Sequence, residues 1–259
     1  MGEYSALLEE ARRTATDAGA LLRRFYDRPG EVFFKGEVNL VTEADTASQD
    51  LILERLSRAF PGHGFLAEEG LDRLGGAEYR WVIDPLDGTT NFAHRLPVFC
   101  VSIGLERRGA LVCGVVHNPM SGETFWAEKG GGAFLDGRAV RVSGIAELGK
   151  ALLATGFPYD LRTTRTNIIP HERFLLRSQA VRRCGSAALD LCSVACGRFD
   201  GFWEFSLNPW DTAAGAVIVE EAGGRVTDFR GRPADIRHPE VLASNGLIHE
   251  AMLGVLDEP

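Results

Sequence analysis

The stretch Trp81–Phe92, "WVIDPLDGTTNF", leads from an apolar segment directly into two aspartates, Asp84 and Asp87. Two carboxylates about 4 Å apart repel each other by about 4 kcal/mol at an effective dielectric constant of about 20. That is a large part of the roughly 5–15 kcal/mol that stabilises a folded domain. The cluster therefore requires a bound cation or the protonation of some of its members. Taken alone, the stretch also fits an ordinary turn, because Asp-Pro and Asp-Gly are common turn dipeptides.

The residues that follow the aspartates, Gly88, Thr89 and Thr90, predict an anion site. Glycine can adopt a positive φ angle, and the two threonines offer hydroxyl and N–H groups where a short helix could begin. Such a helix start suits phosphate. A cation site beside a phosphate site indicates metal-assisted phosphoryl chemistry.

Composition and charge narrow the class of protein. The chain has 259 residues, 45% of them hydrophobic, a net charge of −8 and a sequence pI of about 5.3. The acidic balance argues against a dedicated surface for nucleic acid or anionic membranes. No stretch is long enough to span a membrane, and the acidic start differs from a signal peptide, so we expect a cytoplasmic protein with no membrane partner. The five cysteines form no CxxC pair, and we expect buried thiols.

Hydrophobic periodicity predicts layered helices and sheets. Apolar residues at helical spacing indicate an amphipathic helix over 4–26 and a second helix that begins with a capping pattern at Thr42 and ends before Pro61. Short apolar runs from 65 to 135 predict a mostly antiparallel sheet. Beyond 144 strands alternate with helices, one of them near 163–178, one from Ser186 and one from Asp211. The order predicts a mixed α+β fold without a linker.

Rival phosphate chemistries fit poorly. Phosphatases that use an aspartyl nucleophile need a D-x-D motif, whereas two residues separate Asp84 from Asp87. The segment 144–151, "GIAELGKA", nearly spells a P-loop, but Ala151 replaces the hydroxyl that would hold magnesium. Neither a G-x-S-x-G nor an H-E-x-x-H motif occurs.

Five motifs together carry a resemblance to a known family. They are "GEVNLVTEAD" (36–45), "GFLAEEG" (64–70), "WVIDPLDGTTNF" (81–92), "KGGGAFLDG" (129–137) and "NPWDTAAGAVIVEEAGG" (208–224). In this order and spacing they resemble the inositol monophosphatase family of magnesium-dependent, lithium-sensitive phosphatases. The resemblance implies the five-layered αβαβα sandwich of the inositol monophosphatase and fructose-1,6-bisphosphatase superfamily, usually as a homodimer. We expect one unit over 1–259, with approximate lobes 1–145 and 146–259.

The resemblance also implies a ligand set. One metal would be bound by Glu68, Asp84 and the carbonyl of Leu86, and a second by Asp84, Asp87 and Asp211; a weaker third ion would share Glu68. Oxygen ligands suit Mg²⁺, with Mn²⁺ a possible substitute. By themselves, Glu68 could be a solvated acid after a strand and Asp211 a helix N-cap.

The remaining implied residues surround the reacting phosphate. Thr89, with Asp45 behind it, would position or deprotonate the attacking water, although Asp45 also fits the third position of a capping box. Gly88, Thr89 and Thr90 would bind phosphate. The substrate's leaving group would contact Glu204 and the helix start at Gly185, Ser186 and Ala187, whereas Glu204 alone could be a charge at a strand end. We expect hydrolysis of myo-inositol monophosphate by direct in-line attack of a metal-activated water.

Alternatives remain open at this stage. Asn39 stands where many relatives have aspartate, which would weaken an outer contact or alter the dependence on the third metal. The segment 155–167, whose Tyr159 and arginines could favour another sugar phosphate, neighbours the expected substrate pocket. A related activity on fructose 1,6-bisphosphate, histidinol phosphate or a nucleotide 3′-phosphate therefore competes with the inositol phosphate hypothesis. A second alternative is a regulatory or binding protein that retains the fold.

Overall fold

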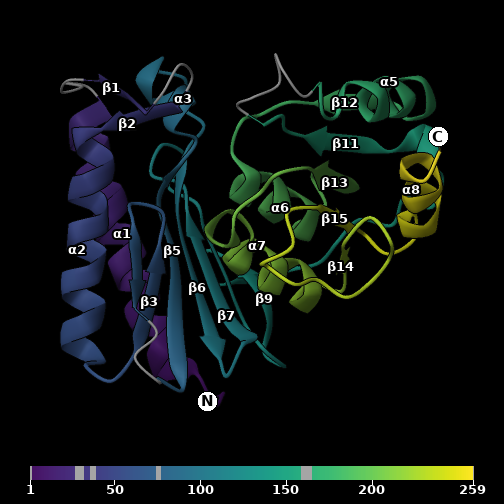
Figure 1. Ribbon diagram of the computed structural model, residues 1–259. Coiled ribbons are helices and arrows are strands. Elements are labelled where there is room, and N and C mark those ends of the chain that lie inside the picture. Colours follow the sequence, from purple (N-terminus) through teal and green to yellow (C-terminus); the bar gives the residue numbers. More distant parts are fainter. Residues whose placement is uncertain (1, 27–31, 36–38, 74–76, 159–164, 259) are drawn as a thin grey trace.

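The computed structural model describes residues 2–26, 32–35, 39–73, 77–158 and 165–258 and shows five layers (Figure 1). Two helices, an eight-stranded sheet, two central helices, a five-stranded sheet and two outer helices follow one another across the molecule. The predicted αβαβα sandwich is confirmed. Tyr159 and the side chain of Asn39 lie outside the described part of the chain.

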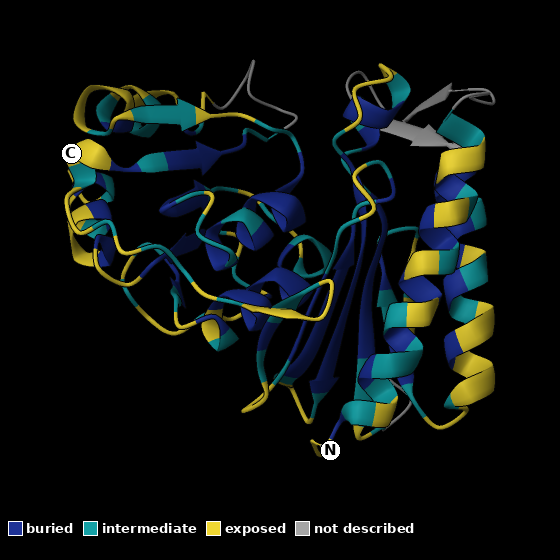
Figure 2. Ribbon diagram, turned by 180° about the vertical axis from the view of Figure 1, so that it is seen from behind, coloured by how far each residue is buried: buried dark blue, intermediate teal, exposed yellow. Residues whose placement is uncertain are grey.

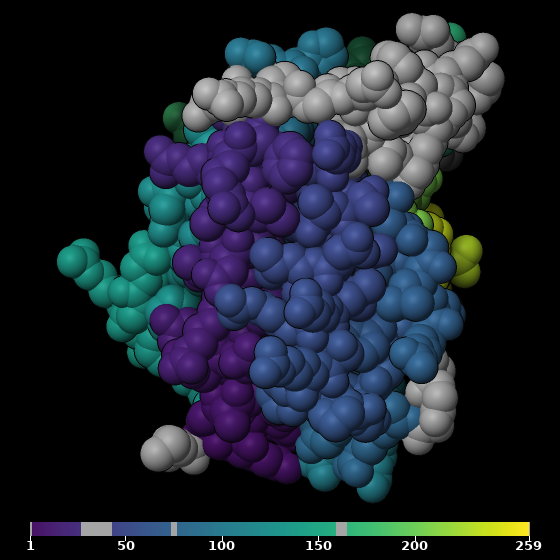
Figure 3. All heavy atoms as spheres, turned by 90° about the vertical axis from the view of Figure 1, so that its left-hand side faces the viewer, coloured from purple at the N-terminus to yellow at the C-terminus, as the bar shows by residue number. Residues whose placement is uncertain are grey.

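The first layer consists of α1 (Ser5–Tyr26) and α2 (Glu43–Ala59), as the periodicity predicts. The apolar stripe of α1 is buried along its length, at Leu8, Ala11, Ala15, Ala18 and Leu22. The opposite faces of both helices are exposed (Figure 2). The two helices lie side by side on this outer face (Figure 3).

The second layer is an eight-stranded sheet in the order β10-β9-β8-β7-β6-β5-β3-β4. Its pairs are antiparallel except for β3 and β5, which run parallel. A separate antiparallel pair is formed by β1 (Val32–Lys35) and β2 (Asn39–Thr42). The strands of the large sheet are β3 (Gly64–Ala67), β4 (Leu71–Arg73), β5 (Tyr79–Asp87), β6 (Cys100–Arg107), β7 (Ala110–His117), β8 (Thr124–Glu128), β9 (Gly132–Leu135) and β10 (Arg138–Val140).

The central layer consists of α6 (Ala187–Ala195) and α7 (Pro209–Glu221), which are buried on nearly all sides. Two glycines in the large sheet allow α7 to approach closely. A Cβ at Gly104 would lie 2.7 Å from Ala213 Cβ, and a Cβ at Gly114 would overlap the backbone of Ala214. This close packing places the first turn of α7 against the sheet that carries Asp84 and Asp87.

The last two layers are a mixed sheet in the order β12-β11-β13-β15-β14 and its outer helices. Here β11 pairs parallel with both β12 and β13, whereas β13–β15 and β15–β14 are antiparallel. The elements are a 3₁₀ turn (Leu148–Lys150), β11 (Leu152–Thr155), α5 (Ile168–Arg177), β12 (Ala180–Arg182), β13 (Gly201–Glu204), β14 (Arg225–Thr227), β15 (Val241–Ser244) and α8 (His249–Leu256).

Three local predictions need correction. The helix expected from Asp211 begins at Pro209, because Asn208 is its N-cap and Asp211 is the third residue of a capping box. The helix expected near 163–178 begins at Ile168. Of the five cysteines, Cys184 and Cys196 are partly exposed rather than buried.

Among the described residues, no helix is both long enough and apolar enough to cross a membrane.

Candidate active site

Both aspartates of the opening motif lie at the end of β5, where its pairing with β6 becomes irregular between Asp84 and Asp87. The Leu86 N–H donates to Asp84 Oδ1 (3.0 Å) instead of to the neighbouring strand. Pro85 has no N–H to pair, and its carbonyl accepts a hydrogen bond from Ser48 Oγ on α2 (2.8 Å). Such an irregularity re-aims side chains that strict alternation would separate, so Asp84 and Asp87 line the same cavity.

The turn after β5 leads into the short helix α3 (Thr89–Ala93). Gly88 has φ 94°, in the left-handed region that favours glycine. A Cβ there would also lie 2.8 Å from the carbonyl oxygen of Val98. Thr89 Oγ1 donates to the carbonyl of Leu86 (3.0 Å), which fixes the threonine hydroxyl beside the acidic cluster.

The loop before α6 is joined to this turn. Asp87 Oδ2 accepts hydrogen bonds from Ser186 Oγ (2.6 Å) and from the Ala188 N–H (2.8 Å). Ser186 is the N-cap of α6, as its place at a predicted helix start suggests. Asn91 Nδ2 donates to the carbonyls of Val98 and Cys184, both at 2.8 Å, and so ties α3 to the same loop. The motifs around 87 and 186, a hundred residues apart, therefore form one rigid unit.

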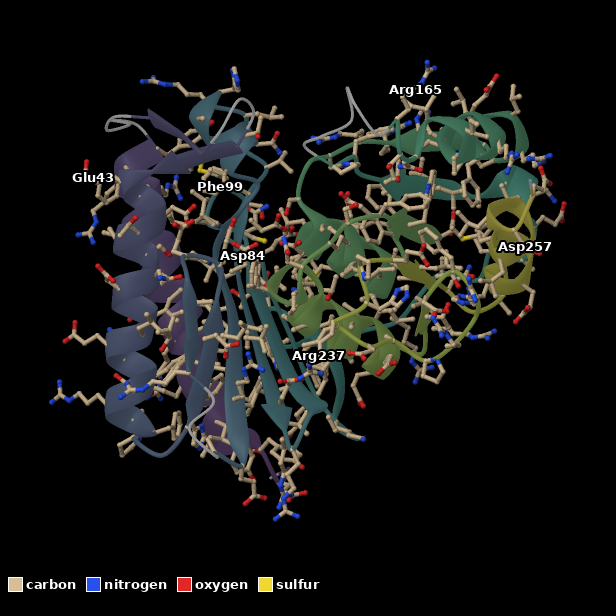
Figure 4. The ribbon with its side chains drawn as sticks, in the orientation of Figure 1. Glu43, Asp84, Phe99, Arg165, Arg237 and Asp257 are labelled. Atoms are coloured by element: carbon tan, nitrogen blue, oxygen red, sulfur yellow. The ribbon has the colours of Figure 1, made fainter. Side chains whose placement is uncertain are left out.

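A cavity of about 350 Å³ lies at this junction. It brings together every residue that the sequence singles out for the site except Asp45: Glu68, Asp84, Leu86, Asp87, Gly88, Thr89, Thr90, Gly185, Ser186, Ala187, Glu204 and Asp211. Asp84 lies in the middle of the molecule, between the large sheet and the second half of the chain (Figure 4). Asp45 is buried on α2, where its carboxylate and those of Glu68 and Glu69 offer oxygens within 4.8 Å of one another.

Burial and mutual repulsion raise the pKa values of the acidic cluster. Desolvation, followed by the charges of Asp45 and Glu69, raises the pKa of Glu68 to about 8. The pKa of Asp84 is raised well above its usual range by desolvation and then by Glu68. Desolvation also raises the pKa of Asp87, although Ser186 and Ala188 oppose the shift by hydrogen bonding.

Asp211 completes the cluster from α7. Its Oδ2 accepts a hydrogen bond from the Asn208 N–H (2.7 Å), which is the reciprocal bond of the capping box. Desolvation, and next the charge of Asp87, raises its pKa well above the usual range. A cation bound among these groups would stabilise their ionised forms and so offset both the desolvation and the repulsion.

The opposite wall of the cavity contains three charged residues: Glu204, Arg183 and Asp190. Desolvation and then the charge of Asp190 raise the pKa of Glu204 well above its usual range, and Arg183 opposes this shift. Sequence reasoning missed Asp190 and Arg183. An acid inside the apolar run "AALDLCSVA" was the signal for Asp190, because a charge within a buried helix requires a partner or a function.

The donor set fits a hard divalent cation. The four carboxylates of Glu68, Asp84, Asp87 and Asp211 and the Leu86 carbonyl all offer oxygen, and the carboxylates crowd one cavity. Oxygen ligands of this kind suit Mg²⁺ or Ca²⁺ rather than softer metals. The residues lining the cavity in the described part of the chain include neither cysteine nor histidine.

A five-layered α+β fold with a carboxylate cluster beside a glycine-threonine turn is typical of a cation-dependent phosphatase. The model of the Inositol monophosphatase family matches residues 3–258, and the chain belongs to this family of phosphatases. An inositol-1-monophosphatase of Mesorhizobium japonicum is 42% identical over 98% of this chain and 97% of its own.

Solved structures agree with the assignment. The extragenic suppressor protein SuhB of Bartonella henselae superposes with a TM-score of 0.93 at 41% identity, covering 98% of this chain and 99% of its own. An inositol monophosphatase from Anabaena gives a TM-score of 0.90 at 44% identity, covering 98% and 96%.

Proposed function

We propose that this phosphatase is Mg²⁺-dependent and hydrolyses myo-inositol monophosphate to inositol and phosphate. The observation that carries the proposal is the single cavity that joins four carboxylates to the turn Gly88–Thr90 and, on its far side, to Glu204. The first two features suit a phosphate with its cations, and the third suits a leaving group rich in hydroxyls. The names of the relatives support the same substrate.

In this proposal Glu68, Asp84 and the Leu86 carbonyl hold one Mg²⁺, and Asp84, Asp87 and Asp211 hold a second. A third, weaker ion shares Glu68, and Mn²⁺ can substitute. When bound, Mg²⁺ would neutralise the charge of the phosphoryl oxygens and lower the pKa of water. Ser186 and the Ala188 N–H orient Asp87 by their hydrogen bonds and favour its ionised form against desolvation.

The protein's own groups handle the phosphate and the proton. Gly88, Thr89 and Thr90 bind the phosphate oxygens, and the Thr89 hydroxyl orients the attacking water. This hydroxyl takes the proton of the water and passes its own proton to the Asp45 carboxylate behind it. The water attacks phosphorus in line, the bond from phosphorus to the inositol oxygen breaks, and that oxygen takes up a proton from solvent. The absence of cysteine and histidine from the described cavity wall supports direct hydrolysis without a phosphoenzyme.

On the leaving-group side, Glu204 accepts hydrogen bonds from the inositol hydroxyls, and Gly185, Ser186 and Ala187 line the approach. A carboxylate suits several hydroxyl donors. Related sugar phosphates are the competing substrates, because they offer hydroxyls to the same wall.

The test is phosphate release by the purified protein from a panel of substrates, with Mg²⁺ and with a chelator. We expect release from inositol 1-phosphate that requires Mg²⁺ and that millimolar Li⁺ inhibits in an uncompetitive or mixed manner. Faster turnover of fructose 1,6-bisphosphate, histidinol phosphate or a nucleotide 3′-phosphate would show that this compound, rather than inositol monophosphate, is the preferred substrate. No release from any of them would favour a regulatory or binding protein that retains the fold.

We further propose a cytoplasmic homodimer of single-unit chains, each with lobes 1–145 and 146–259, whose partners are a small phosphomonoester and a second copy rather than nucleic acid or membrane. Helix α5 supports the dimer, because it exposes four large apolar side chains beside the edge strand β12: Ile168, Ile169, Leu175 and Leu176. Light scattering at micromolar concentration should give twice the mass of the chain. A monomer mass would contradict this.

A further inference from the structure

The Glu204 carboxylate lies against a glycine on the neighbouring strand. Glu204 ends β13, and Gly156 directly follows β11, which pairs parallel with β13 so that Thr155 lies opposite Trp203. Both Gly156 and Glu204 line the cavity. A Cβ at Gly156 would overlap all three atoms of the Glu204 carboxylate group. Gly156 has no positive φ, so the backbone conformation does not require glycine; the space for Glu204 does.

A buried side-chain network holds Gly156 in place. Asn167 Nδ2 donates to the Gly156 carbonyl (2.7 Å) and to Thr155 Oγ1 (2.8 Å), while Asn167 Oδ1 accepts from Trp203 Nε1 (2.6 Å). Thr155 Oγ1 donates in turn to the Trp203 carbonyl (2.6 Å). Asn167 is 2% exposed and has φ 69°. One amide therefore joins the two strand ends that carry Gly156 and Glu204.

Asn167 itself does not line the cavity. Its three hydrogen bonds nevertheless end on Gly156, on Thr155 opposite Trp203 and on Trp203, which directly precedes Glu204. A fully satisfied buried polar network rigidifies the groups that it connects. Asn167 thereby fixes the distance between Gly156 and the Glu204 carboxylate.

We propose that Gly156 and Asn167 are positioning residues that set the Glu204 carboxylate in the cavity and so select phosphomonoesters with a polyhydroxylated leaving group. This inference rests on the proposed function, in which Glu204 accepts hydrogen bonds from inositol. Neither residue touches the phosphate or the cation ligands. Their substitution should change selectivity while leaving the phosphoryl chemistry intact.

The first experiment is a double-mutant cycle of Gly156→Ala with Glu204→Ala, measured as kcat/KM for inositol 1-phosphate and for p-nitrophenyl phosphate. We expect Gly156→Ala to lower the ratio of the two values at least tenfold, chiefly through KM for inositol 1-phosphate. In the Glu204→Ala background it should change the ratio less than twofold, because the added Cβ no longer meets a carboxylate. Gly201→Ala, on the same strand as Glu204, is the control for strain, because its Cβ would press on Met252 of α8.

The second experiment compares Asn167→Asp with Asn245→Asp. Both asparagines are buried, and Asn245 Nδ2 likewise donates to a backbone carbonyl, that of Ile145 (2.7 Å), and to a hydroxyl, that of Ser143 (2.9 Å), but away from the cavity. Each substitution keeps an acceptor and removes the donors. We expect both to lower Tm, and only Asn167→Asp to lower the selectivity ratio.

The outcomes separate the two hypotheses. An equal loss by Gly156→Ala in both backgrounds, an equal loss on both substrates, or no change in the ratio would overturn the positioning role. If Glu204→Ala alone leaves the ratio unchanged while Gly156→Ala alters it, the assignment of Glu204 to the polyol fails instead. A purely structural Asn167 would behave like Asn245.

Discussion

The two walls of the cavity are built in different ways. The wall that suits cations and phosphate, the local wall, consists of the continuous stretch 84–90 together with Glu68 and Asp211. The geometry of the stretch is set by a strand irregularity and by a glycine at positive φ. The opposite wall, the assembled wall, comes from three segments that are distant in the sequence, around 156, 183–190 and 204–208. Its geometry depends on the parallel pairing of β11 with β13 and on the Asn167 network.

This difference indicates a division of labour. The local wall contains the charged groups that would act on the phosphate of any phosphomonoester. The assembled wall would contact only the leaving group, which differs between substrates. Substitutions in the first wall should therefore reduce turnover of all substrates alike. Substitutions in the second should discriminate between substrates.

The largest effect should follow Asp84→Asn, which keeps the acceptor for the Leu86 N–H and removes one buried charge. We expect kcat in Mg²⁺ to fall by about 10³-fold or more for inositol 1-phosphate and p-nitrophenyl phosphate alike. A single electrostatic group at a reacting centre contributes about 10²–10³, and Asp84 is assigned to both ions. In chelator, Tm should stay equal or rise, since repulsion from Glu68 and Asp87 is relieved.

Asp200→Asn is the matched control for that variant. Asp200 is also buried, but its oxygens accept hydrogen bonds from Ser143 Oγ and from the Leu152 N–H, and it does not line the cavity. It should lower Tm while the folded protein keeps its turnover. Near wild-type activity of Asp84→Asn in Mg²⁺ would refute the metal assignment.

A smaller and selective effect should follow Glu204→Gln in the assembled wall. The amide keeps the size of the side chain and loses the charge that attracts several hydroxyl donors, so kcat/KM for inositol 1-phosphate should fall about tenfold, in line with ~1–3 kcal/mol for a charged hydrogen bond. For p-nitrophenyl phosphate, which lacks hydroxyls on its leaving group, the change should stay within about twofold. Steady-state kinetics on both substrates tests this prediction. Equal losses on both would show that Glu204 has a structural role rather than a role in binding the leaving group.

The same contrast explains how far sequence reasoning reaches. The two N-terminal helices and a mostly antiparallel sheet follow from periodicity, and the crowding of Asp84 and Asp87 follows from their spacing, since these depend on neighbours in the chain. The addition of Glu68 and Asp211 to the acidic cluster came from the family resemblance. Asp190, Arg183 and Gly156 were missed because their significance depends on contacts across the fold. Taken alone, Asp211 also fits an N-cap, and only the structure shows that Asn208 occupies that position.

The smallest effect concerns how the stability of the protein in chelator depends on pH through Glu68 of the local wall. Glu68 has its pKa raised to about 8, so between pH 4.5, the ordinary pKa of glutamate, and pH 8 the folded state holds a proton that the unfolded state has released. This contribution to stability is complete below the unfolded pKa and is lost as pH rises through about 8.

Two other groups of residues limit the pH window. The histidines with lowered pKa values, His63, His117 and His249, add stability as pH rises to about 6.5 and nothing above it. The cysteines with raised pKa values, such as Cys113 at about 12, remove stability only as their unfolded thiols ionise, above about pH 8. Between pH 7 and 8 neither group contributes. The other carboxyls with raised pKa values, such as Asp84 and Asp211, are present in both the wild type and Glu68→Gln, so the difference between the two proteins reports on Glu68.

In that window we expect Tm of the wild type in chelator to fall relative to Tm of Glu68→Gln, which has no proton to lose at this position. A relative shift of a few degrees is expected, because ~1 kcal/mol corresponds to ~2–4 °C for a chain of this size. Excess Mg²⁺ should raise the wild-type Tm more at pH 8 than at pH 7, because binding favours the ionised carboxylates. A constant difference between the two proteins, or one of opposite sign, would show that Glu68 is already ionised at pH 7 and that the crowding of the local wall is relieved elsewhere.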